Sequence, residues 1–261
     1  MIFCPLYSGS SGNSIFVSSE KTRVLIDAGL PGKSIESAMN QIGHTTADID
    51  AIFVTHEHID HTKGIGVLSR KYDIPIYANE DTWTAMGNSI GKIKEHNIKI
   101  FSEDCISIKD IEVESFNISH DAACPNGYSI TSEKKKVCIA TDLGFFSQEV
   151  KNHIQDADAI LLESNHDVEM LKFGPYPYTL KRRILSNVGH LSNEDCGKAI
   201  VSITNNKFKN IILGHLSKTN NYPELAYQTV INILRENNIT LGKELSISMA
   251  KRDMPSNYIE I

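Results

Sequence analysis

One short stretch of this chain limits what it can fold into more than any other. It follows the apolar run at positions 51–54 and holds, within six residues, four side chains that can bind a metal: His56, His58, Asp60 and His61. An apolar run that gives way to polar residues is typical of a buried strand that ends in a loop. The sequence therefore predicts a cluster of metal ligands at the end of a strand.

The ligand types in this cluster indicate which metals it would bind. Imidazole and carboxylate groups suit Zn²⁺, Mn²⁺ or Fe, and the cluster contains no cysteine that would favour a closed structural zinc site. On a bending loop, His56 and His58 can face one ion while Asp60 and His61 turn toward another. The alternative is a solvated loop with coincidental histidines, but four ligands in six residues after an apolar strand argue against it.

The composition is that of an ordinary globular protein. The chain has 261 residues, of which 41% are hydrophobic and 22% are charged, so there is ample material for a core, and we expect one domain over residues 1–261. The formal net charge is −6. This charge gives no general attraction for nucleic acid, so local groups or metals must hold any polyanionic substrate.

Cysteine usage and hydropathy bear on location. The five cysteines contain no CxxC pair, so they predict neither a disulfide framework nor a zinc knuckle, and a reducing compartment fits. The first residues lack a basic region followed by a long apolar segment, and no run approaches the roughly eighteen apolar residues of a membrane span. We expect a cytoplasmic protein that does not enter the membrane.

The pattern of apolar runs predicts strands and helices in both halves of the chain. We expect strands at 2–7, 14–18, 23–27, 51–54, 75–78, 99–101, 105–108, 112–116, 127–131 and 136–140. We expect helices at 34–41, 64–72 and 80–89, and a further one that Ser192 caps and that runs to about residue 204. Two halves that each mix strands and helices indicate two sheets packed face to face with helices outside.

Further ligand candidates follow apolar runs in the second half. They are His120, Asp142 and His215. Taken singly, each is more often an ordinary loop residue. The cluster at 56–61 reverses this balance, because a two-metal site needs further nitrogen ligands and a carboxylate that bridges the ions. Asp27 and Glu163 also end strands, and either could orient a metal-bound histidine from behind.

Several polar residues have two open interpretations. His190 either packs at the start of the helix that Ser192 caps or directs its imidazole toward a phosphate. The same choice applies to Asn165 and His166. The serine- and glycine-rich segment 8–13 could hold a phosphate, but it lacks the GxxxxGK pattern and no helix follows it, so a turn is favoured.

Basic and aromatic residues concentrate in one later segment. They are Lys172, Phe173, Tyr176, Tyr178, Lys181, Arg182 and Arg183. Stacking on rings together with phosphate pairing is how single-stranded nucleic acid is held without sequence preference. The alternative is a solvated helix face, which the sequence alone slightly favours.

The motif HxHxDH at 56–61, followed in order by His120, Asp142 and His215, resembles that of the metallo-β-lactamase fold superfamily. The resemblance covers essentially the whole chain. It implies an α/β fold, a four-layer αβ/βα sandwich whose two mixed sheets are flanked by helices, with the ligands at one edge. It also implies that His56, His58 and His120 bind one metal, that Asp60, His61 and His215 bind a second, and that Asp142 bridges the two.

Segments 161–167, 174–177, 180–184 and 189–193 resemble the YycJ/WalJ group of that superfamily, which is associated with 5′-to-3′ exonuclease activity on DNA. This resemblance implies two divalent ions, Zn or Mn and possibly Fe, and a nucleic acid substrate, single-stranded or 5′-ended DNA. Asp60 would orient the nucleophile and His190 would protonate the leaving oxygen. Substrate contacts would come from Asn165, His166, Lys181 and Arg182.

Other activities of the superfamily fit less well. Antibiotic-hydrolysing lactamases often place a cysteine at the second metal, and no cysteine lies near the expected strand end. The chain also lacks the long insert of the β-CASP nucleases and the arm that RNase Z uses on tRNA. Two alternatives stay open, hydrolysis of a thioester or small cyclic phosphodiester, and a metal-binding regulatory protein without turnover. The sequence does not indicate the oligomeric state.

Overall fold

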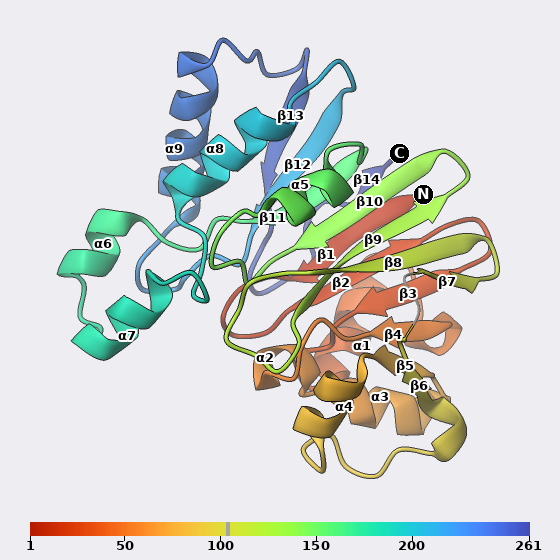
Figure 1. The fold of residues 1–261 in the computed structure, drawn as a ribbon. Helices are drawn as coiled ribbons and strands as arrows, with labels where there is room; N and C mark the ends of the chain where they lie inside the picture. The colour runs from red at the N-terminus through yellow and green to blue at the C-terminus, as the bar shows by residue number, and fades with distance from the viewer. Residues whose placement is uncertain (103–104) are drawn as a thin grey trace.

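The computed structural model describes residues 1–102 and 105–261, which form two seven-stranded sheets (Figure 1). The first sheet has the order β14-β1-β2-β3-β4-β5-β6, with β1 (Ile2–Tyr7), β2 (Ser14–Ser18), β3 (Arg23–Ile26), β4 (Ala51–Phe53), β5 (Ile76–Ala78), β6 (Ile98–Ile100) and β14 (Ile259–Glu260). The second has the order β13-β12-β11-β10-β9-β8-β7, with β7 (Cys105–Ile108), β8 (Ile111–Asn117), β9 (Asn126–Ser132), β10 (Lys135–Ala140), β11 (Ala159–Glu163), β12 (Lys209–Gly214) and β13 (Leu245–Met249).

Helices cover the outer face of each sheet. Beside the first sheet lie α1 (Gly32–Gln41), α2 (Ile59–Thr62), α3 (Ile65–Tyr72) and α4 (Glu80–Met86). The second sheet carries α5 (Gln148–Ile154), α8 (Asn193–Ile203) and α9 (Pro223–Glu236), while α6 (Val168–Phe173) and α7 (Tyr178–Ile184) stand out to one side (Figure 1). Among the described residues, no helix is both long and apolar enough to cross a membrane.

Strands in the interior of each sheet, such as β2 and β11, are buried on both faces because each sheet is covered on both sides there. In β2, Ile15 and Val17 pack in the core between the sheets, whereas Phe16 packs against the helices of the first sheet. In β10, Val137 also lies in the core between the sheets, and Cys138 packs against the helices of the second sheet. This alternation follows from the two-residue period of a strand. The predicted four-layer α/β sandwich is confirmed.

The parallel strands bring the ligand-bearing segments to one edge. Ile26 of β3 pairs with Phe53 of the parallel strand β4, and β10, β11 and β12 are parallel neighbours in the second sheet. Carboxyl ends of parallel strands emerge at the same edge of a sheet. Tyr128 of β9 joins the two sheets there, since its hydroxyl donates a hydrogen bond of 2.7 Å to the carbonyl oxygen of Val54.

The structure corrects two local predictions. The helix expected at 80–89 ends at Met86, because Gly87 adopts a φ of +46° that an α-helix does not allow. The cluster expected on a bending loop includes a short helix, α2, that carries Asp60 and His61. The helix expected from Ser192 is confirmed as α8, and the Ser192 hydroxyl accepts a hydrogen bond of 3.1 Å from the N–H of Asp195.

Candidate metal centre

Three of the predicted ligands converge at the first half of the site. His56 and His58 follow β4, His120 follows β8, and one nitrogen of each lies within 4.8 Å of the others. The side chain of His56 is fully buried, and its Nε2 has no hydrogen-bond partner. Burial, and next the charge of His61, lower the pKa of His56 well below its usual value. A buried neutral imidazole with a free nitrogen is the form that binds a metal.

Asp142 lies between this group and the remaining histidines. Its Oδ2 is 3.3 Å from Nε2 of His61 and 3.2 Å from Nδ1 of His215. Its Oδ1 is 3.7 Å from Nε2 of His120. Burial alone would raise the pKa of Asp142, but the facing imidazoles of His215 and His61 hold it well below the usual range. The imidazoles therefore favour the ionised form of the carboxylate, and its two oxygens face different groups of histidines.

Asp60 and His61 reach the site from α2, which packs against the segment after β3. The carboxylate Oδ2 of Asp60 is 3.7 Å from Nε2 of His61, and the carbonyl oxygen of Asp60 accepts a hydrogen bond of 2.8 Å from the N–H of Asn13. A Cβ at Gly29 would collide with that carbonyl oxygen. Only glycine allows the two segments to approach this closely.

Asp27 holds His61 from behind. Its Oδ2 lies 2.7 Å from Nδ1 of His61 and also accepts from the hydroxyl of Thr55, while its Oδ1 accepts from the N–H of Thr55. Burial would lower the pKa of His61, but the carboxylates of Asp27 and Asp142 raise it well above the usual value. This geometry matches the expectation that Asp27 orients a histidine, because it directs Nε2 toward Asp142.

Three residues of the site adopt a left-handed backbone conformation. Asp27 and Asp142 each have a φ of 60°, and His215 has a φ of 54°. This region is sparsely populated by residues other than glycine and costs on the order of 1 kcal/mol or more for each. Each residue lies where the chain leaves a strand, so the strain accompanies sharp turns that bring the side chains together.

Glu163 supports the second half of the site. Its side chain is fully buried at the end of β11, and its Oε1 lies 2.8 Å from Nδ1 of His190. His190 also lies 3.6 Å from Oδ1 of Asp142. Burial would lower the pKa of His190, but the charge and hydrogen bond of Glu163 raise it to about 9. The carboxylate of Glu163 therefore favours the protonated form of the His190 imidazole.

Asn165 and His166 lie beneath the site in the protein interior. The Asn165 amide donates a hydrogen bond of 2.9 Å to the carbonyl oxygen of His215, so it fixes the backbone of that ligand. His166 is 1% exposed, neither of its ring nitrogens has a hydrogen-bond partner, and burial lowers its pKa to about 4. A substrate would reach His166 only after a rearrangement.

In the basic helix α7, the residue that faces the site is Arg183, and not Lys181 or Arg182 as predicted. Arg183 donates a hydrogen bond to Oδ2 of Asp121, whose Oδ1 is 3.4 Å from Nε2 of His120. Lys181 instead donates a hydrogen bond of 2.8 Å to the carbonyl oxygen of Lys172, and Arg182 lies over the ring of Tyr178. Arg183 and His190 both line a cavity of about 170 Å³, with Ser10, Asp121, Asn165 and Ser217.

Sequence reasoning did not single out Asp121 as a residue of the site. Its only signal was its position directly after His120, which places a carboxylate beside an expected ligand. Glu57 was also overlooked, although it lies inside the HxHxDH motif. Its Oε1 accepts a hydrogen bond of 2.9 Å from the N–H of Ala123, which fixes the loop that carries His120.

The donor atoms fit a divalent metal. The site offers imidazole nitrogens and carboxylate oxygens, and three of these atoms are buried without a hydrogen-bond partner: Nε2 of His56, Oδ2 of Asp142 and Nδ1 of His215. Buried polar atoms without a partner are rare and costly in native proteins. A cation would satisfy them, so the cluster is compatible with divalent metal binding.

A sandwich of two sheets with a histidine and aspartate cluster at their shared edge defines the metallo-β-lactamase class of fold. The crystal structure of Zn²⁺-bound PqqB from Methylobacterium extorquens has the same fold, with a TM-score of 0.67 at 17% identity over 98% of this chain and all of that one. A model of the beta-lactamase superfamily domain matches residues 22–215.

Two curated relatives are much more similar in sequence. The exodeoxyribonuclease YycJ of Bacillus anthracis is 46% identical over 97% of each chain. The exodeoxyribonuclease WalJ of Streptococcus pneumoniae serotype 2 is 44% identical over 98% of this chain and 96% of that one. The chain belongs to the beta-lactamase superfamily and, within it, to the YycJ/WalJ group.

Proposed function

We propose that this chain is a metal-dependent phosphodiester hydrolase, an exonuclease that degrades 5′-ended single-stranded DNA in the 5′-to-3′ direction. The proposal of a DNA exonuclease is supported by relatives that carry the name exodeoxyribonuclease and align along nearly their whole length. A DNA substrate also favours a cytoplasmic location. The enzyme would hold two divalent ions, Zn or Mn and possibly Fe.

The observation that carries this proposal is the orientation of Asp142. One of its oxygens faces His120, and the other faces both His61 and His215. A carboxylate with this orientation can bridge two ions. The first ion would be held by His56, His58 and His120, and the second by Asp60, His61 and His215. Such ions lower the pKa of water and stabilise the charge that develops on phosphoryl oxygens.

The side chains around the ligands have distinct roles in the proposed reaction. Asp60 would orient the attacking water as well as bind a metal, since its carboxylate lies beside His61. His190 would donate a proton to the leaving oxygen. Its Nδ1 is held by Glu163, and its imidazole lines the cavity next to the metal centre, so Nε2 is left for the substrate.

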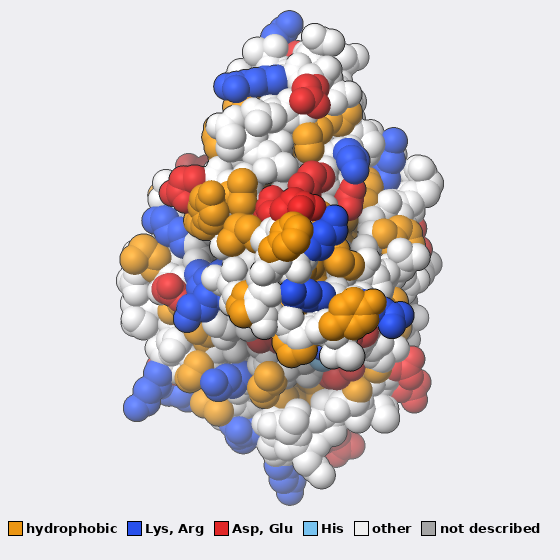
Figure 2. All heavy atoms as spheres, turned by 90° about the vertical axis from the view of Figure 1, so that its left-hand side faces the viewer, with side chains coloured by type: hydrophobic (Ala, Val, Ile, Leu, Met, Phe, Trp, Pro, Cys, Tyr) orange, Lys and Arg blue, Asp and Glu red, His pale blue; other side chains and the backbone are white. Residues whose placement is uncertain are grey.

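The surface around the mouth of the site suits an anionic polymer with exposed bases. Figure 2 shows this face, where Lys and Arg side chains lie among hydrophobic ones, together with some Asp and Glu side chains. Phe173 and Tyr178, at 84% and 74% exposed, project from α6 and α7 beside the cations of this segment. Bases would stack on these rings, while Lys181 and Arg182 pair with phosphates. Asn165, which lines the small cavity, would contact the substrate there, and His166 would contact it only after a rearrangement.

A substrate panel tests the proposal. Protein loaded separately with Mn²⁺ and Zn²⁺ would be assayed on 5′-phosphorylated single-stranded DNA, the same strand as a duplex, RNA of the same sequence, a cyclic nucleotide and a glutathione thioester. We expect release of mononucleotides from the 5′ end of the single strand, followed with a label at either end. Turnover of the thioester or the cyclic nucleotide alone would refute a nuclease. Inactivity of fully loaded protein on all substrates would point to a regulatory protein.

A further inference from the structure

A second, larger cavity opens beside the ligand His215. It has a volume of about 590 Å³ and is formed by the segment after β12, the start of α9 and the segment after β13. Its apolar wall includes Leu216, Tyr222, Met249 and Met254. Tyr222 and Met254 are 49% and 51% exposed, so part of this apolar surface faces solvent. We call it the Tyr222 cavity.

Three cations surround the Tyr222 cavity. They are Lys218, Lys251 and Arg252, against a single carboxylate, that of Asp253. None of the three cations forms an ion pair with a carboxylate of the described residues. Because the chain as a whole has a net charge of −6, this local excess of positive charge favours an anionic ligand.

Arg252 connects the wall of the Tyr222 cavity to the metal centre. Its Nη2 donates a hydrogen bond of 2.8 Å to the carbonyl oxygen of Leu216, the residue after His215. The guanidinium also packs against Gly9, next to Ser8. Ser8 lines the cavity too, and its hydroxyl accepts a hydrogen bond of 2.9 Å from the N–H of His215. The cavity therefore begins one residue away from a proposed metal ligand.

The segment after His215 separates two cavities. Leu216 and Lys218 line the Tyr222 cavity, whereas Ser217 between them lines the smaller cavity that contains His190. A polymer bound at the metal centre would therefore have a second place for one of its units close to the cleaved bond. A cavity of this volume lies within the range of small-ligand sites, so it can accommodate a nucleobase.

We propose that the Tyr222 cavity binds a nucleotide of single-stranded DNA adjacent to the one that is cleaved. The base stacks on Tyr222 and packs against Met249 and Met254, and the phosphates on either side pair with Lys218 and Lys251. Tyrosine offers a ring face that any base can stack on, and methionine adapts to different shapes. This subsite therefore holds DNA without reading its sequence. The inference depends on the proposed function.

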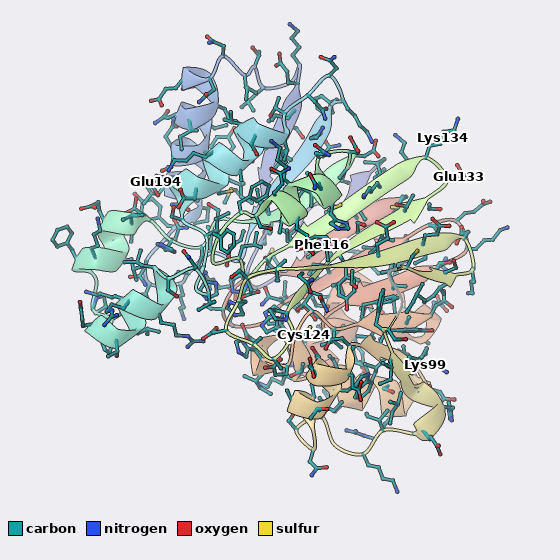
Figure 3. All side chains as sticks on the ribbon, viewed as in Figure 1. Lys99, Phe116, Cys124, Glu133, Lys134 and Glu194 are labelled. Atoms are coloured by element: carbon teal, nitrogen blue, oxygen red, sulfur yellow. The ribbon has the colours of Figure 1, made fainter. Side chains whose placement is uncertain are left out.

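Two variants test the subsite. Lys218→Ala/Lys251→Ala removes the two lysines and keeps Arg252, and Lys134→Ala/Lys243→Ala is its control. Lys134 lies in the β9–β10 turn, far from α6 and α7 (Figure 3). Lys243 precedes β13, whereas the Tyr222 cavity lies at the other end of that strand. Tyr222→Ala removes the ring but keeps the backbone that begins α9. Its control is Phe208→Ala, an aromatic residue that is 42% exposed just before β12.

Each protein would be assayed on a 5′-phosphorylated 12-nucleotide strand and on bis(p-nitrophenyl) phosphate, a diester that has one phosphate and no neighbouring nucleotide. We expect each test variant to lower kcat/KM for DNA about tenfold or more. The lysine variant should also reduce the slope of log affinity against log salt by about 1.4, as the loss of two phosphate contacts requires. Both test variants should hydrolyse the small diester at the rate of the unaltered protein. Both control variants should match the unaltered protein on both substrates.

Three outcomes would overturn the inference. Equal kcat/KM and an equal salt slope for DNA in both test variants, with an active parent protein, would remove the subsite and leave the proposed function intact. An equal loss on both substrates would assign these residues to the metal centre. A parent protein that hydrolyses the small diester but no DNA would refute the proposed function, and the subsite with it.

Discussion

Glu163 and His190 form the contact that joins the two loops at the second half of the metal centre. Oε1 of Glu163 lies 2.8 Å from Nδ1 of His190. Oε2 accepts hydrogen bonds of 2.7 Å and 3.1 Å from the N–H groups of Leu143 and Leu191. Leu143 follows Asp142 and Leu191 follows His190. One fully buried carboxylate thus fixes both the proposed bridging ligand and the proposed proton donor.

Replacement of this carboxylate should impair catalysis more than folding. Glu163→Gln keeps the side-chain shape but removes the charge and puts a donor where an acceptor is needed. Residues that orient a metal site in this way typically contribute 10- to 100-fold, so we expect kcat to fall by about that factor. Turnover of bis(p-nitrophenyl) phosphate measures it. The control is Glu149→Gln, since Glu149 also accepts a backbone hydrogen bond, from Asn117, but with an exposed side chain. Equal kcat in the two variants would contradict the role.

Replacement of Asp27 should weaken the binding of metal ions. In Asp27→Asn the amide oxygen can still accept a hydrogen bond from the N–H of Thr55. The variant loses the negative charge behind His61 and one of the two acceptor oxygens, so His61 is no longer oriented by a carboxylate. We expect about 10- to 100-fold weaker metal binding, measured by competition with a chromophoric chelator. Asp110→Asn serves as the control, because Asp110 accepts hydrogen bonds from Ser19 and Thr22 in a distant turn. Unchanged metal affinity in Asp27→Asn would exclude this role.

The candidate ligands can be recognised in the sequence because each lies beside a local signal. The cluster at 56–61 is contiguous, and His120, Asp142 and His215 each follow an apolar run, so strand ends and ligand chemistry coincide. The fold class follows from the same apolar runs. The structure brings these ligands together at one edge.

The sequence does not reveal which basic residue of α7 faces the site. Leu180, Arg183 and Ile184 share the face that lines the small cavity, three and four residues apart, as the helical period requires. Three basic residues follow one another at 181–183. Composition alone therefore cannot show which of them faces the site in so short a helix. The pairing of Arg183 with Asp121 spans 62 residues. It depends on how α7 folds back over the site, which no local pattern encodes.

Substitutions of the two arginines of α7 should differ in which substrates they affect. Arg183→Ala releases Asp121 beside His120, so we expect kcat/KM to fall about tenfold on both DNA and bis(p-nitrophenyl) phosphate. Arg182→Ala should weaken only DNA turnover, because Arg182 is exposed and its guanidinium lies over the ring of Tyr178. The Arg183–Asp121 pair is partly exposed, so its loss should change the free energy of unfolding by less than about 1 kcal/mol. A loss confined to DNA in both variants would contradict the link to Asp121.

Metal binding should stabilise the fold through Asp142. Ligands that bind only the native state add about 2.7 kcal/mol at a hundredfold excess over Kd. For a chain of this size that corresponds to a rise in Tm of roughly 5–10 °C. We expect this rise when Mn²⁺ or Zn²⁺ is added to chelator-treated protein, measured by calorimetry.

Asp142→Ala should lose both this rise and all cleavage of DNA, because the Asp142 carboxylate lies between His61, His120 and His215, with one oxygen facing His120 and the other facing His61 and His215. Its metal-free Tm should also fall, because the facing imidazoles of His61 and His215 stabilise the ionised carboxylate of Asp142 in the folded protein. A control variant, Asp158→Ala, removes a carboxylate that pairs with Lys207 far from the metal centre. It should lower Tm but keep both the response to metal and activity. Full activity in Asp142→Ala would rule out the proposed centre.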